Sequence, residues 1–166
     1  MSDDAPTVTL TDWRALSEGQ CGAVLALEIS AEQLEYAGAL RKSVAACAAG
    51  DPADVVGLAI SNDATIVGWV ALKRRAAAPD WVADDAAVVS GLRVDAKHQG
   101  RGFGAAALAE MARWITRHWT DTTRLILRVD DGNAAGIRAY EKAGWIETGE
   151  RRMGRVGVER TMSLKL

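Results

Sequence analysis

The sequence has few of the residues that build disulfide frameworks or metal sites. Its 166 residues include two cysteines, Cys21 and Cys47, and two histidines, His98 and His118. The cysteines lack both the short spacing of a zinc-binding pair and the dense pattern of a secreted disulfide scaffold. We therefore expect two reduced thiols and no bound metal.

An excess of charge and long apolar runs are absent as well. Lys and Arg total 20 against 22 Asp and Glu, a formal net charge of -2, which argues against a general nucleic-acid binder. No apolar run reaches the roughly 20 residues of a membrane-spanning helix. Residues 1–6 are acidic and polar. We expect a cytoplasmic protein with neither a membrane nor a nucleic-acid partner.

Hydrophobic residues, by contrast, make up 49% of the chain, enough to predict one globular domain spanning residues 1–166. Hydrophobic spacing predicts strands at 7–10, 55–60, 65–72, 86–94, 124–129, 146–152 and 158–166, and helices at 18–29, 31–49, 105–119 and 133–143. Ser17 and Ser30 each precede a Gln by three residues, the capping-box pattern of a helix start. Hairpins at both ends and a strand–helix–strand unit between them indicate a mixed α+β sheet.

The most informative stretch runs from Asp95 to Gly104, Asp-Ala-Lys-His-Gln-Gly-Arg-Gly-Phe-Gly. It connects a predicted strand to a predicted helix. A helix start exposes backbone N–H groups and the positive end of the helix dipole. Glycines let that backbone approach a ligand closely. The turn therefore indicates a phosphate or pyrophosphate site.

Two familiar phosphate motifs fit this turn poorly. It lacks the Gly-Lys-Ser/Thr ending of a P-loop. Gly102-Phe-Gly104-Ala-Ala-Ala107 does fit the dinucleotide fingerprint, with Asp130 some twenty residues on. However, the preceding strand ends too early, and too little chain follows to build a doubly wound sheet. A dinucleotide-binding oxidoreductase remains the alternative on this pattern.

A second block lies further along the chain: Asn133-Ala-Ala-Gly-Ile-Arg-Ala-Tyr140-Glu-Lys-Ala-Gly144-Trp145. Together with Gln99-Gly-Arg-Gly102-Phe-Gly104, it resembles two motifs of the GNAT superfamily of acetyl-CoA-dependent N-acetyltransferases. Trp145 stands where that family usually has Phe. The resemblance covers about the last half of the chain.

This resemblance implies the acyl-CoA N-acyltransferase fold, with about seven strands and four helices. The strands at 86–94 and 124–129 would splay apart to hold the cofactor. Acetyl-CoA would be the co-substrate and a primary amine the acceptor. Main-chain groups of Leu92, Arg93 and Val94 would meet pantetheine and the thioester carbonyl. The pyrophosphate would bind at Gln99, Gly100, Arg101, Gly102, Phe103, Gly104 and Ala105.

Tyr140 and Asn133 carry the remaining roles that the resemblance implies. A phenol can hydrogen-bond or protonate a leaving thiolate, whereas a tyrosine on a half-buried helix face can also simply pack by its ring. Asn133 would hydrogen-bond the pantetheine arm, and its ordinary role is that of a helix N-cap.

The general base and the acceptor are less defined. Many family members have a Glu just before the position of Leu92, whereas residues 88–91 contain no acid. Glu28, Glu32, Asp84, Asp85 or a chain of waters are the alternatives. Residues 27–33 faintly resemble bacterial spermine/spermidine acetyltransferases, which implies a polyamine acceptor held by Glu28, Glu32, Glu35, Asp84 and Asp85. Trp69 and Trp81 are candidate walls, with core packing favoured for Trp69.

Other functions stay open at this point. A catalytically silent CoA-binding module, or an acetyltransferase acting on a protein or peptide amine, would fit the same motifs. The protein could also act as a homodimer.

Overall fold

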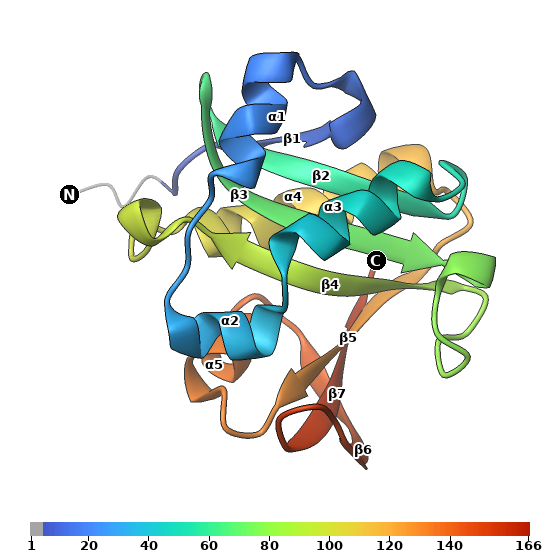
Figure 1. The fold of residues 1–166 in the computed structure, drawn as a ribbon. Helices are drawn as coiled ribbons and strands as arrows, with labels where there is room; N and C mark the ends of the chain where they lie inside the picture. The colour runs from blue at the N-terminus through green and yellow to red at the C-terminus, as the bar shows by residue number, and fades with distance from the viewer. Residues whose placement is uncertain (1–4) are drawn as a thin grey trace.

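A computed structural model describes residues 5–166, and its centre is a seven-stranded mixed sheet. The strands are β1 (Thr9–Asp12), β2 (Val55–Asn62), β3 (Thr65–Arg74), β4 (Ala86–Val94), β5 (Arg124–Asp130), β6 (Ile146–Met153) and β7 (Val158–Lys165). Their order across the sheet is β1-β2-β3-β4-β5-β7-β6 (Figure 1). Neighbours pair antiparallel except β4 and β5, which are parallel. The predicted mixed sheet is confirmed.

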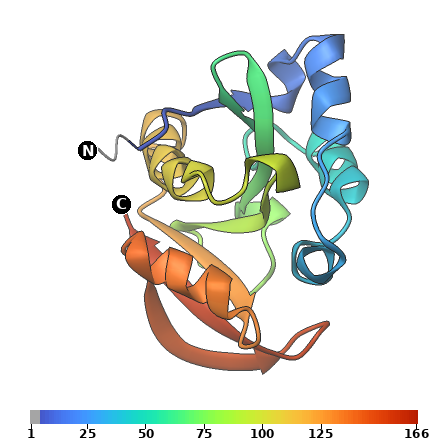
Figure 2. The same ribbon diagram turned by 90° about the vertical axis from the view of Figure 1, so that its left-hand side faces the viewer.

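Five α-helices of the described residues cover the two faces of this sheet. They are α1 (Glu18–Leu25), α2 (Ala31–Ala37), α3 (Leu40–Ala49), α4 (Phe103–His118) and α5 (Ala134–Lys142). Figure 2 shows α1, α2 and α3 on one side of the sheet and α4 and α5 on the other. Alternate residues of β2 serve the two sides: Val56 and Leu58 pack with the α4 core, and Val55 and Ala59 with the core under α3.

The predicted helix at 31–49 is wrong, because the structure divides it into α2 and α3. Gly38 has φ +72°, a left-handed value that ends α2 and that glycine adopts without strain. The Arg93 guanidinium donates to the carbonyls of Ala37 and Gly38, both at 3.0 Å. These bonds satisfy carbonyls at the C-terminal end of α2. The Arg93 side chain, which comes from β4, therefore stabilises the break between α2 and α3, and helical spacing alone did not predict this break.

Two other predicted boundaries are also corrected. β1 lies at Thr9–Asp12 rather than 7–10, since the register pairs Asp12 with Leu58. The first helix ends at Leu25, not at 29, and α2 starts after Ser30.

The helix boundaries that were predicted from capping residues agree better with the structure than those predicted from hydrophobic spacing. Both predicted capping boxes form: Ser17 with Gln20 and Ser30 with Gln33. Gly144 follows α5 with φ +91°, as expected of a helix end, and Trp145 is buried beside it. β4 begins and ends where the apolar run does.

None of the helices described between residues 5 and 166 combines the length and apolar character needed to cross a bilayer. In the same part of the chain, no three metal-binding side chains come together.

Candidate active site

The strands β4 and β5 diverge after a short parallel ladder. They pair from Ala86 with Arg124 to Val88 with Ile126, three pairs in all. Beyond them β4 contains a bulge, where Gly91 adopts φ +63° and the register with β3 shifts. A cavity of about 420 Å³ opens past the divergence. Its lining comes from α2, β4, the glycine-rich turn, α4, β5 and α5.

The glycine-rich turn presents main-chain groups to this cavity. Gly100 and Gly102 have φ +74° and +84°, which favour glycine at both positions. Gly102 is the N-cap of α4 and supplies no side-chain cap, so the first N–H groups of the helix remain available. Together with the positive end of a sixteen-residue helix, they have the geometry and charge that suit an anion.

Most predicted phosphate-binding residues line the cavity, but Arg101 does not. The lining includes Gln99, Gly100, Gly102, Phe103, Gly104 and Ala105. The Arg101 guanidinium instead lies 5.2 Å from the centre of the Phe103 ring and 3.3 Å from His98 Nδ1. His98 is also part of the lining.

A buried carboxylate attaches this turn to the α1–α2 connection. Asp95 accepts hydrogen bonds from the backbone N–H groups of Glu28 at 3.0 Å and Lys97 at 2.9 Å. Burial alone would raise the pKa of Asp95, but these donors and the nearby cations lower it below the usual value. The Gln99 and Gln33 side-chain amides also exchange hydrogen bonds, at 2.9 and 3.1 Å. The turn and α2 are therefore held together.

Leu92, Arg93 and Val94 line the cavity from the end of β4. The Arg93 side chain is buried, and its Nε also donates to the Gly91 carbonyl at 3.1 Å. Burial lowers the pKa of this guanidinium. Arg93 thus links the β4 bulge to the end of α2, which sequence spacing did not predict.

Helix α5 brings Asn133 and Tyr140 to the opposite wall. The Asn133 side chain caps the helix by accepting from the Gly136 N–H at 3.1 Å, and it also lines the cavity. Tyr140 packs against Trp145, with ring centroids 5.7 Å apart. Burial raises the pKa of the Tyr140 phenol to about 12, so the hydroxyl stays protonated at neutral pH.

Two residues at this cavity were missed by sequence reasoning. Asp130, at the end of β5, is the one carboxylate among the described residues that line it. The side chain is buried, and its Oδ1 has no hydrogen-bond partner in the described part of the protein. Tyr36, on α2, lines the same space. In the sequence Asp130 ends an apolar strand, a signal that fits the dinucleotide fingerprint as well and so did not single it out for this site.

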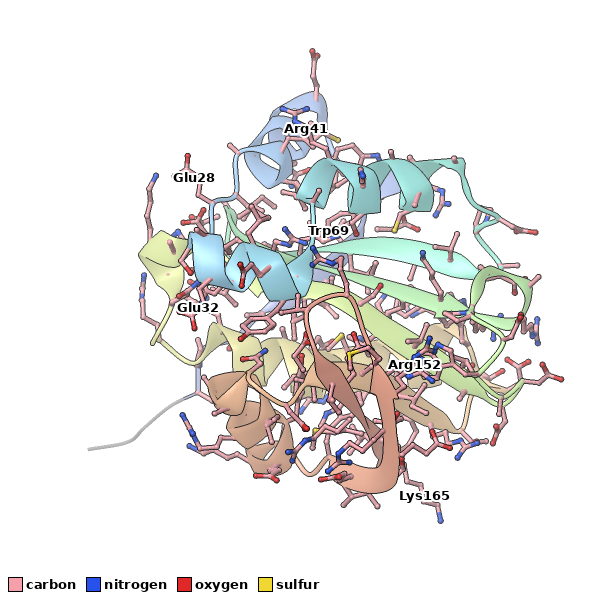
Figure 3. All side chains as sticks on the ribbon, turned by 60° about the horizontal axis from the view of Figure 1, so that its bottom comes forward. Glu28, Glu32, Arg41, Trp69, Arg152 and Lys165 are labelled. Carbon is pink, nitrogen blue, oxygen red and sulfur yellow. The ribbon has the colours of Figure 1, made fainter. Side chains whose placement is uncertain are left out.

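The acids predicted to serve as base or acceptor wall lie elsewhere. Glu28, Glu32 and Glu35 are exposed and absent from the lining, where α2 contributes Gln33 and Tyr36 instead. Figure 3 shows Glu28 and Glu32 at the edge of the molecule. Asp84 is exposed, and Asp85 bonds Thr123 at the opposite end of β4. The carboxylate lining predicted from these residues is wrong.

The arrangement suits acyl transfer from a phosphate-bearing thioester. Main-chain N–H groups at one end can bind a pyrophosphate, and a protonated phenol and a carboxylate lie along the same cavity. The alternative of a doubly wound dinucleotide fold is contradicted by the order of the strands in the sheet. It is also contradicted by the eight residues, 95–102, that connect β4 to α4.

Comparison with solved structures identifies the fold of this protein. Solved structures that share this fold include the ribosomal-protein-S18-alanine N-acetyltransferase from Escherichia coli, at 18% identity and TM-score 0.66, covering 96% of this chain and 94% of that one. The aminoglycoside acetyltransferase AAC(6')-Ib in complex with acetyl-CoA shares 16% identity, TM-score 0.75, with 96% and 93% covered. The GNAT domain of S. lividans PAT shares 24% identity, TM-score 0.69, with 96% and 89% covered. The fold is the acyl-CoA N-acyltransferase fold.

The family follows from the sequence itself. The family model described as Acetyltransferase (GNAT) family matches residues 20–145. The chain belongs to this family and is an acetyl-CoA-dependent N-acetyltransferase. A search of curated proteins finds no significant match.

Proposed function

We propose that this protein transfers the acetyl group of acetyl-CoA directly to a primary amine of a small molecule. One observation carries the proposal. The glycine-rich turn, the Tyr140 side chain and the Asp130 carboxylate line the same cavity between the divergent strands. A pyrophosphate site, a hydroxyl donor and a proton acceptor are the groups that amine acetylation requires.

In this proposal the main chain holds the cofactor. The N–H groups of Gly102, Phe103, Gly104 and Ala105 bind the pyrophosphate, together with Gln99 and Gly100. The main chain of Leu92, Arg93 and Val94 binds the pantetheine arm and donates to the thioester oxygen. The Asn133 amide, whose oxygen is occupied as a cap, donates its N–H to the arm.

Asp130 replaces the strand-four acid that the sequence lacks. Its carboxylate, which belongs to the cavity lining, accepts the proton that the amine releases as the new C–N bond forms. A buried carboxylate without a partner carries a desolvation cost, so it favours a cationic or proton-donating ligand. The substrate amine is such a ligand, and it must first lose its ammonium proton to solvent, because only the neutral amine has the lone pair that attacks the thioester carbon.

Tyr140 assists the departing sulfur by hydrogen bonding rather than by giving up its proton. Its pKa of about 12 exceeds that of a thiol, roughly 8.5. Full transfer would therefore be uphill by about 5 kcal/mol. A donated O–H···S hydrogen bond stabilises the thiolate as the C–S bond breaks, and solvent then protonates the sulfur.

The names of fold relatives cover both aminoglycosides and a ribosomal protein. A small molecule is favoured here because the β6–β7 hairpin reaches across to α2, where the Arg155 guanidinium donates to the Glu35 carbonyl. This contact places the hairpin and α2 side by side next to the splayed strands and leaves less room there for a protein acceptor.

The test measures acetyl-CoA binding by calorimetry and CoA release with a panel of small amines. We expect binding and amine-dependent release. Binding without acetylated product from any amine, peptide amines included, would support the catalytically silent CoA-binding module instead. Product only from peptide amines would favour a protein acceptor.

A further inference from the structure

A second cavity, of about 790 Å³, lies beside the splayed strands, where α2 and the β6–β7 hairpin approach them. It is lined by the end of α2, by β3, β4 and β5, by the loop at 77–81 and by the β6–β7 hairpin. Six residues line both cavities: Tyr36, Ala37, Val89, Ser90, Gly91 and Arg128. The two cavities are therefore continuous with each other, and Asp130 lines the first of them.

The charge of this cavity is strongly positive. Lys73, Arg128, Arg152 and Arg155 line it, against a single carboxylate, Glu159. In residues 5–166 none of these four cations forms an ion pair within 4.0 Å, whereas most other arginines of the hairpin region do. Glu159 stands opposite Arg152 in the β6–β7 register and offsets only part of this charge.

Arg128 is the best-positioned of the four. Its guanidinium lies 3.6 Å from the centre of the Trp81 ring, which fixes its position. Its Nε is buried and has no hydrogen-bond partner among the described residues. Burial and then the nearby charge of Arg152 lower its pKa, and the carboxylates of Glu159 and Glu150 offset part of this shift. Two guanidinium groups directed at one space repel each other unless an anion lies between them.

The β6–β7 hairpin contributes the other two arginines, Arg152 and Arg155, to the lining of the second cavity. Arg152 is near the end of β6, and Arg155 lies in the turn that follows. Figures 1 and 2 place this turn on the same side of the sheet as α2. Figure 3 shows Arg152 beside the hairpin, well separated from Glu28 and Glu32. The acids of the polyamine hypothesis thus lie outside the lining of this cavity, whereas half-buried Arg128 and exposed Arg152 and Arg155 form part of it.

We propose that the acceptor is a small amine that carries a carboxylate or phosphate at a distance from the amino group. Arg128, Arg152 and Arg155 bind the anion, and Asp130 receives the amine. This proposal rests on the function proposed above. Guanidinium groups suit both anions because they donate in a planar fork. Polyamines and other polycations are disfavoured by repulsion from the same side chains.

The experiment compares matched acceptors of increasing chain length: ω-amino carboxylates, the ω-amino phosphates, the plain alkylamines and the diamines. We expect kcat/KM to fall in the order anionic, neutral, cationic, with a gap of roughly 10-fold or more between the first two. The carboxylate and phosphate arms identify the anion. A preference for diamines or alkylamines overturns the proposal.

Arg152→Gln removes one cation, and Arg151→Gln is its matched control. Arg151 is the neighbour on β6, outside the cavity and paired with Glu147. We expect Arg152→Gln to lower kcat/KM for the anionic amine roughly 10-fold more than kcat/KM for alkylamines. Arg151→Gln should affect neither. Equal losses for both substrates, or for both variants, would contradict the assignment.

A further measurement distinguishes failure of this acceptor proposal from failure of the proposed acetyltransferase function. If acetyl-CoA binds but no amine reacts, calorimetry with N-acetyl ω-amino carboxylates and N-acetyl diamines still measures the charge preference of the cavity. Tighter binding of the anionic product supports the proposal, and equal or weaker binding overturns it.

Discussion

The cavity at the glycine-rich turn and the cavity beside the splayed strands are neighbours, yet they are built in opposite ways. The groups that we propose bind the cofactor in the first cavity come largely from the main chain of one short segment, 99–105. The second takes charged side chains from β3, β5 and the β6–β7 hairpin. A main-chain site needs particular backbone angles, so its glycines are visible in the sequence. A side-chain site needs strands to come together, so its members are scattered along the chain.

The largest effect should come from the acceptor side. Asp130→Asn keeps the shape of the side chain but removes the proton acceptor. We expect kcat/KM to fall by roughly 10²–10⁴-fold, with acetyl-CoA affinity unchanged. Steady-state kinetics and calorimetry check this. Asp131→Asn is the control, because Asp131 is exposed and pairs with Arg160 at 2.8 Å. A loss of less than a few-fold would leave the amine to react without this base.

A substitution in the glycine-rich turn, Gly104→Val, should instead weaken binding of acetyl-CoA. A Cβ at Gly104 would lie 3.9 Å from Val94 Cγ2, an ordinary contact, so Gly104→Val should fold. Its branched side chain would nevertheless block close approach of the pyrophosphate. We expect acetyl-CoA affinity to fall roughly 100-fold or more.

Gly102→Val is the less informative variant, because φ +84° at Gly102 would strain the fold as well. Gly22→Val on α1, where a Cβ meets open space, is the control. Unchanged affinity for acetyl-CoA in Gly104→Val would remove the pyrophosphate from this turn.

Tyr140 lies where the two sides meet. Tyr140→Phe keeps the ring against Trp145 and removes only the hydroxyl. We expect kcat to fall by roughly 10- to 100-fold, which is less than for a full proton donor because a thiolate is a good leaving group. The acetyl-CoA dissociation constant should change little. Equal turnover of the two proteins in single-turnover experiments would make Tyr140 a packing residue.

The smallest effect is confined to alkaline solution. The folded-state pKa of Tyr140 is about 12, above the roughly 10 of an unfolded chain. Its contribution to stability is complete below pH 10 and is lost as the pH rises toward 12. Across that window the native protein should lose about 2–3 kcal/mol relative to Tyr140→Phe. Urea unfolding of both proteins from pH 8 upward measures the difference, and parallel curves would contradict the burial of this phenol.

The sequence predicted the cofactor side more completely than the acceptor side. Of the predicted cofactor residues, the structure leaves Arg101 outside the cavity, since its guanidinium packs over Phe103. The glycine turn, β4, Asn133 and Tyr140 lie where their local signals indicate. The acceptor side was predicted from clustered acids near 28–35, and these are solvent-exposed. Sequence proximity is a poor guide there, because the lining comes from segments far apart in the chain.

Local physics therefore fixed part of this protein directly. Gly100, Gly102 and Gly144 determine turns that only their backbone freedom permits, and Ser17 and Ser30 start helices through their own side chains. The tertiary structure decided the rest. The Arg93 guanidinium divides a continuous helical pattern at Gly38, and strand pairing brings Arg152 from β6 to the cavity that Arg128 of β5 also lines. Charge and hydrogen-bond partners act through space, so their effects depend on neighbours that the order of residues does not reveal.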